Sequence, residues 1–181
     1  MNDSGTLTPP VSEHDHTQGP ADAPVTLVEY GDYQCPYCGA AYPEIKRLQK
    51  ALGKKLRFAF RNFPLTQAHP YALIAAEAAE AAALQGKFWE MHDLIYENQD
   101  ELDLEVLPSW IARLGLDLNA FGTAIKQGDI TKRIKEDRAS GIRSGVNGTP
   151  TFFINGKRYD DDADYDSLRA ALGEQLVREA L

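Results

Sequence analysis

The order of apolar and polar positions predicts a strand, a helix and a second strand in the first third of the chain. Residues 24–31 read PVTLVEYG, a short apolar and β-branched run typical of a central strand. Residues 36–53 have helical spacing, with Pro36 in the first turn and Gly53 as the stop. Residues 54–65 alternate again and predict a second strand. Together they predict a βαβ unit with a right-handed crossover.

The pattern then becomes helical, and strands return only near the C-terminus. Several apolar stripes at helical spacing between 67 and 145 predict a bundle of short helices, with Trp89 and Trp110 in its core. The pair Asn155-Gly156 between two apolar runs predicts a β-hairpin. An amphipathic helix, with Asp164 as its N-cap, is expected to close the chain.

This succession predicts an α/β fold, βαβ followed by ββα, with an inserted all-helical domain. We assign residues 23–66 and 146–181 to the α/β domain and residues 67–145 to the insertion. Residues 1–22 are polar and rich in Pro, Ser, Thr and Asp, so we expect a tail or an extended arm.

Composition and charge argue against a membrane-spanning protein and against a nucleic-acid-binding protein. The 181 residues are 43% hydrophobic and 25% charged, as in ordinary globular proteins, and no run approaches 18 apolar residues, so we expect no membrane insertion. The net charge of −8 argues against nucleic-acid binding, which needs a basic surface. The N-terminus lacks the basic start and apolar centre of a secretory signal, so we expect a cytoplasmic protein.

Cys35 and Cys38, the two cysteines of the chain, lie at the predicted strand-to-helix turn. The free N–H groups and dipole of a helix N-terminus stabilise a thiolate at Cys35, and Cys38 lies one turn further along the helix. A disulfide across two residues would constrain little of the unfolded chain. A zinc site needs about four ligands, and the histidines, including His14 and His16 in the predicted tail, are not suitably spaced. The pattern favours a redox-active pair in which Cys35 exchanges disulfides and Cys38 resolves them, with no metal.

A second signal lies far downstream, in the segment GVNGTPTFFING. Thr149-Pro150 opens the returning strand, where a proline costs no ladder hydrogen bond. X–Pro bonds are mostly trans. In this context we nevertheless expect a cis bond, which would turn the backbone groups of Thr149 towards an extended peptide.

With both motifs on one chain, residues 14–181 resemble the DsbA-like branch of the thioredoxin-fold oxidoreductases, which includes versions fused to sodium/proton antiporters. The resemblance implies a thioredoxin fold, with Cys35 as the exposed nucleophile, Cys38 as its buried partner and Pro150 as the cis-proline that faces them. It also implies that Thr149 contacts bound peptide through its backbone.

The residues between the two cysteines differ from those of the best-known periplasmic oxidase of this branch. Pro36-Tyr37 is the dipeptide typical of glutaredoxins, so the direction of electron flow stays open. We expect Tyr37 to expose its ring beside the cysteines, within reach of substrate.

Further candidates come from polar residues near the pair. Glu29 interrupts an apolar strand six residues before Cys35, and burial would raise its pKa, so we interpret it as a proton acceptor for Cys38, with Arg61 as a partner on the neighbouring strand. The resembling family also has an acid at this position. Asp32 would raise the pKa of Cys35 if its charge lay near that sulfur, but we interpret it as a turn residue. His69 could face the site from the start of a helix, and we interpret it as a capping or packing residue.

We therefore predict a protein-disulfide oxidoreductase that uses no metal or organic cofactor, with glutathione as an additional co-substrate candidate. Its partners would be protein or peptide thiols and disulfides, together with a redox partner that the sequence does not identify. Two alternatives stay open: a glutathione-dependent isomerase or transferase related to DsbA, and a non-enzymatic redox sensor or binding module.

Overall fold

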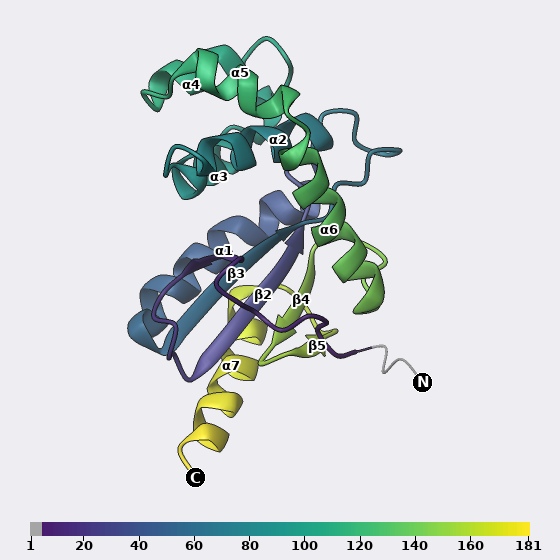
Figure 1. Cartoon of the computed structure of the whole chain (residues 1–181). Helices are drawn as coiled ribbons and strands as arrows, with labels where there is room; N and C mark the ends of the chain where they lie inside the picture. Colours follow the sequence, from purple (N-terminus) through teal and green to yellow (C-terminus); the bar gives the residue numbers. More distant parts are fainter. Residues whose placement is uncertain (1–4) are drawn as a thin grey trace.

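A five-stranded sheet lies at the centre of the computed structural model, which describes residues 5–181 (Figure 1). The strand order is β1–β3–β2–β4–β5, with β2 and β3 parallel and the other neighbouring pairs antiparallel. β2 is the middle strand and is buried on both faces, as its unbroken apolar run predicts. The strands are β1 (His16–Gln18), β2 (Val25–Gly31), β3 (Leu56–Asn62), β4 (Thr151–Ile154) and β5 (Lys157–Tyr159).

Helices cover both faces and one end of this sheet (Figure 1). Within the described chain they are α1 (Pro36–Leu52), α2 (Ala72–Ala83), α3 (Phe88–Glu97), α4 (Leu107–Arg113), α5 (Leu118–Lys126), α6 (Asp129–Arg143) and α7 (Tyr165–Glu179), with short 3₁₀ turns at Gly53–Lys55 and Gln99–Glu101. α1 starts at Pro36, whose fixed φ suits a first turn, and it ends at Gly53, whose φ of 50° favours glycine.

Alternation along the strands divides the core into two layers. Leu27, Phe58 and Phe60 belong to the larger cluster, in which Leu48 of α1 and Leu168 of α7 are also buried. The neighbouring strand residues point the other way: Val28, Tyr30 and Ala59 form a smaller cluster with Leu7, Phe63, Val146 and Phe153. This alternation decides which side chains can reach the cysteines.

The predicted helical insertion is present as five helices, α2 to α6, between β3 and β4, and the described chain has no strand between 67 and 145. Trp110 is buried and Trp89 packs against the core, as expected. The last helix, α6, packs against β3, and the hydroxyls of Ser140 and Tyr30 are 2.7 Å apart. The insertion is therefore joined to the sheet along α6 as well as through its two connections.

Two local predictions at the C-terminal end are confirmed. Asn155 and Gly156 have φ of 46° and 79° and link β4 to β5 in a two-residue hairpin. The Asp164 carboxylate accepts hydrogen bonds from the N–H groups of Asp166 and Ser167 and so caps α7.

Of the two forms expected for residues 1–22, a tail or an extended arm, the described part has the second: it is an extended arm held at both edges of the sheet. The Leu7 N–H donates to the Gly156 carbonyl beside β5, and β1 pairs with β3 at the opposite edge. Between these edges, Arg61 donates to Asp15 at 2.7 Å and to the Pro9 carbonyl at 3.0 Å. Hydrogen bonds and one buried ion pair hold this arm, rather than an apolar stripe. The polar composition of the segment therefore could not distinguish an arm from a tail. Residues 1–4 lie outside the described residues.

Candidate active site

The two cysteines lie where β2 gives way to α1. Cys35 is the N-cap residue of α1, with extended backbone angles, and Cys38 lies in the first turn, with both thiols free. Cys38 is fully buried, as expected, but the expectation of an exposed Cys35 is wrong, since only 3% of that residue is exposed. Cys35 is covered because its thiol packs beneath the loop before β4 and donates to the Thr149 carbonyl at 3.3 Å.

The surroundings of Cys35 favour its thiolate. Hydrogen bonding from the Cys38 thiol lowers the pKa of Cys35 to about 5, against the opposing effect of burial. Thr149 and the backbone N–H groups of Cys38 and Tyr37 lower this pKa further. These N–H groups belong to the first turn of α1, where they have no partner within the helix, so helix geometry provides the site for an anion.

Cys38 has the opposite character. Burial raises the pKa of its thiol well above the ordinary value, and the charges of Cys35 and Glu29 raise it further. Its sulfur accepts one N–H, from Asp32, at 3.5 Å. At neutral pH the pair therefore consists of one thiolate and one thiol, the asymmetry that thiol–disulfide exchange requires.

Glu29 is buried in β2, on the same face as Leu27, beside the cysteine pair. Burial, reinforced by the Cys35 charge, raises its pKa to about 8, and its Oε1 has no hydrogen-bond partner in the described chain. The predicted pairing with Arg61 is wrong. Glu29 lies opposite Phe60 in the strand register, so Arg61 projects from the other face, where it contacts the Tyr30 hydroxyl and the arm.

The Thr149-Pro150 bond is cis, as expected, and the pair lies half-buried in the loop that covers Cys35. The Thr149 carbonyl accepts a hydrogen bond from the Cys35 thiol, so in this structure the carbonyl is directed at the cysteine. The Thr149 Oγ1 is buried, and the Thr149 side chain helps to lower the pKa of Cys35. Pro36 and Tyr37 are exposed at the start of α1, and 74% of Tyr37 is accessible, as expected for a ring beside the cysteines.

Matches to known proteins agree with this geometry. A family model described as Thioredoxin matches residues 11–174. The chain belongs to the thioredoxin family. Its structure is similar to that of alpha-DsbA2 from Wolbachia pipientis, described as a thiol-disulfide exchange protein, with a TM-score of 0.79 and 25% identity over 90% of this chain and 88% of that one. BdbD from Bacillus subtilis matches with a TM-score of 0.79 and 24% identity over 92% and 95% of the two chains. The predicted DsbA-like thioredoxin fold with a helical insertion is confirmed.

Curated relatives of this thioredoxin-family chain include Na(+)/H(+) antiporters that are much longer than this chain. It is 46% identical over 166 residues to a Na(+)/H(+) antiporter NhaA 1 of Salinispora arenicola, which covers 92% of this chain and 25% of the antiporter. It is also 41% identical over 167 residues to a Na(+)/H(+) antiporter NhaA of Herminiimonas arsenicoxydans, a match that covers 92% of this chain and 26% of that antiporter. The chain spans about a quarter of the length of the curated relatives it matches.

Two side chains that sequence reasoning left unused or undervalued hold the cysteine turn of this thioredoxin-family chain. The Gln99 amide, from the 3₁₀ turn after α3, donates to the carbonyls of Tyr33 at 2.8 Å and Cys35 at 2.9 Å. The Asp32 carboxylate accepts the N–H groups of Gln34 and Cys35, which confirms its interpretation as a turn residue. No local signal marks Gln99, because it lies 64 residues from Cys35.

His69 and His16 each contact a buried carboxylate, and His69 is linked to the cysteine turn through Asp32. His69 is not the N-cap of α2, which is Tyr71. Its Nδ1 lies 2.8 Å from the Asp32 carboxylate. His16 stacks on Phe88 and contacts Glu80 at 2.9 Å, so it lies in β1 rather than in a tail. Nowhere in residues 5–181 do three or more His, Cys, Asp or Glu side chains form a group that could hold a metal ion. Among the same residues, no helix has the length and apolar character needed to cross a membrane.

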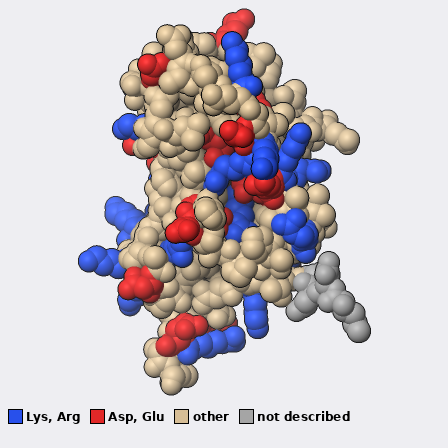
Figure 2. Space-filling model, viewed as in Figure 1, with Lys and Arg blue, Asp and Glu red and all other residues tan. Residues whose placement is uncertain are grey.

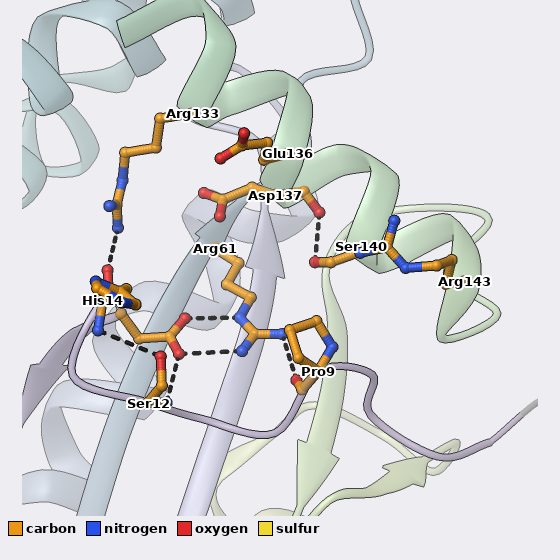
Figure 3. Close-up of a pocket in the computed structure, with 10 residues that line it drawn as sticks. Pro9, Ser12, His14, Arg61, Arg133, Glu136, Asp137, Ser140 and Arg143 are labelled. Carbon is orange, nitrogen blue, oxygen red and sulfur yellow. Dashed lines mark hydrogen bonds and ion pairs between the residues drawn. The ribbon is translucent and has the colours of Figure 1, made fainter. Parts of the chain in front are cut away.

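A polar pocket lies between the arm, β3 and α6 (Figure 3). Its lining includes Arg61, Asp15 and Asp137, and neither cysteine nor Glu29 belongs to it. Burial raises the pKa of Asp137 to about 6. On the face drawn in Figure 2, acidic and basic side chains are interspersed rather than gathered by sign.

Proposed function

We propose that this chain is a thiol–disulfide oxidoreductase that exchanges the Cys35–Cys38 dithiol or disulfide with protein or peptide thiols. The observation that carries the proposal is the asymmetric placement of the pair: Cys35 is the N-cap residue of α1 against Thr149, and Cys38 is fully buried in the first turn. The pKa of Cys35 is accordingly lowered to about 5, whereas burial raises that of Cys38. A nucleophile and a resolving thiol need these opposite properties. The pair is the redox centre, and the proposal requires no metal or organic cofactor.

In the first step the Cys35 thiolate attacks a substrate disulfide. A bond forms between the Cys35 Sγ and one substrate sulfur, the substrate disulfide breaks, and the leaving sulfur takes a proton from water. The negative charge of Cys35 is lost in this mixed disulfide. The charge of Cys35 helps to raise the pKa of Glu29. When that charge is lost, the pKa of Glu29 falls, and a larger fraction of Glu29 is ionised at neutral pH.

In the second step Cys38 resolves the mixed disulfide. Glu29 accepts the proton of the Cys38 thiol, the Cys38 sulfur attacks the Cys35 Sγ, and the second substrate sulfur leaves as a thiol after protonation. Two electrons pass from the pair to the substrate, and the reverse sequence oxidises a substrate dithiol. Both groups are buried, and the charge of Glu29 raises the pKa of Cys38, which places them close enough to interact electrostatically.

Substrate would bind as an extended segment along the Thr149-Pro150 loop. The Thr149 carbonyl, released from the Cys35 thiol once that sulfur is a thiolate or disulfide, would accept a peptide N–H. The exposed ring of Tyr37, next to Pro36 at the start of α1, would pack against the peptide.

Reduction of insulin and oxidation of a reduced peptide test this proposal directly. We expect Cys35→Ser to abolish turnover in both directions. Cys38→Ser is the matched control, because it keeps the nucleophile and should accumulate a mixed disulfide on Cys35, detectable by mass spectrometry. Undiminished turnover by Cys35→Ser would rule the assignment out.

Equilibration of the pair with glutathione separates the two alternatives from dithiol exchange and gives the direction of reaction. A Cys35–glutathione adduct without cycling of Cys38 would favour a glutathione-dependent isomerase or transferase. Very slow exchange with every thiol and no peptide binding would favour a redox sensor or binding module.

A further inference from the structure

Asp32 is a buried carboxylate placed next to the cysteine turn. Its side chain is fully buried and accepts four hydrogen bonds, from the backbone N–H groups of Gln34 at 2.8 Å, Cys35 at 3.2 Å and Leu65 at 2.8 Å, and from His69. Acceptance of several N–H groups is typical of an ionised carboxylate. The same residue donates its own N–H to the Cys38 sulfur at 3.5 Å.

A charged Asp32 carboxylate would oppose the thiolate that the helix favours. A negative charge three residues before Cys35 disfavours a second negative charge on that sulfur, and a buried location weakens the screening between them. The Asp32 carboxylate also takes the Cys35 N–H, which is then less able to stabilise the sulfur. The net effect of Asp32 on Cys35 depends on whether a cation neutralises it.

His69 is the group that can do so. Its Nδ1 lies 2.8 Å from the Asp32 Oδ2, and its side chain is 20% exposed, so solvent can protonate it. Imidazole changes charge between about pH 5 and 8. Across the described chain, Asp32 is the charged side chain within ion-pair distance of His69. The other titrating groups of this region are Cys35 and Cys38 in α1 and Glu29 in β2, and Glu29 titrates near 8.

We propose that His69 is a positioning residue that sets, through Asp32, how strongly the cysteine turn favours the thiolate form of Cys35. When the imidazole is protonated, the His69–Asp32 pair is neutral and the thiolate is favoured. When the imidazole loses its proton, the Asp32 charge opposes the thiolate. Because the thiolate belongs to the reduced state, the pair becomes a stronger oxidant in acid than it would be without His69. This inference rests on the proposed redox function of the pair.

Two variants separate charge from structure. His69→Asn keeps a hydrogen-bond donor near Asp32 but cannot carry a charge, whereas His69→Ala removes both. His14→Asn is the matched control, because His14 is exposed on the arm, beside the pocket of Figure 3. Ultraviolet absorbance of the thiolate against pH gives the pKa of Cys35, and equilibration with glutathione gives the redox balance.

We expect His69→Asn to raise the pKa of Cys35 by about half a unit or more, with an unchanged unfolding midpoint. Its glutathione equilibrium should shift about three-fold towards the disulfide in acid, and the difference from the wild type should narrow as the pH rises. His14→Asn should change neither measurement.

Wild-type titration and redox balance in His69→Asn would overturn the inference, even if His69→Ala is unstable, since the role of His69 would then be structural. The absorbance titration needs no turnover. A pair that fails to cycle would therefore defeat the proposed function without deciding the role of His69.

Discussion

Replacement of Glu29 by glutamine should change how the stability of the protein depends on pH. In the unfolded chain this carboxyl ionises near 4.5, whereas in the folded chain its pKa is about 8. Between these values the folded chain holds one proton more than the unfolded chain, so its stability falls as the pH rises through this interval. Glutamine resembles the neutral acid but cannot ionise. The stability of the variant should therefore lack the fall with rising pH that Glu29 causes in the wild type.

The size of the effect follows from the interval. Each pKa unit corresponds to about 1.4 kcal/mol, so the folded state loses about 3 kcal/mol between pH 4.5 and pH 7 and about 5 kcal/mol by pH 8. We therefore expect Glu29→Gln and the wild type to be equally stable near pH 4. At pH 7 the variant should be more stable by about 3 kcal/mol. Cys35, whose pKa is lowered, contributes with the opposite sign, but it is present in both proteins and largely cancels in the difference.

Urea unfolding of both reduced proteins at a series of pH values measures this difference. Glu174→Gln is the control, because Glu174 is exposed on α7 and its replacement should leave the profile unchanged. Oxidation of the pair removes the Cys35 charge, which is the second cause of the raised pKa of Glu29, so the difference should shrink in the disulfide form. Parallel profiles for Glu29→Gln and wild type would refute a neutral, buried Glu29.

Three further changes test other contacts. Cys38→Ala should raise the pKa of Cys35 by about one unit or more, seen in the thiolate absorbance, because it removes the strongest hydrogen bond to that sulfur; an unchanged titration would contradict this. Gly39→Ala places a Cβ against the Gln99 Oε1, so the Gln99 amide must move. Loss of the two hydrogen bonds of that amide should cost about 1–3 kcal/mol in urea unfolding. Arg61→Met leaves the arm's buried carboxylate unpaired and should cost about 3 kcal/mol or more; a smaller loss would mean that the arm is held otherwise.

Local signals in the sequence determined the elements and the reactive pair. Pro36 and Gly53 set the ends of α1, and Asn155-Gly156 set the hairpin, because these residues restrict or permit backbone angles wherever they occur. The position of Cys35 at a helix start followed from the same signals, and with it the stabilised thiolate. These inferences need only neighbours within a few residues.

Contacts across the fold were decided by the tertiary structure. Strand register placed Arg61 beside Tyr30 and away from Glu29, and a one-residue difference in register would have reversed this. Gln99 reaches the Cys35 carbonyl, and His69 reaches Asp32, across 64 and 37 residues of chain. The cover over Cys35 and the course of the arm likewise depend on packing between distant segments. Periodicity and turn residues determine whether each segment forms a strand, a helix or a turn. Strand register and packing determine which side chains come into contact, and the charge around the cysteines depends on those contacts.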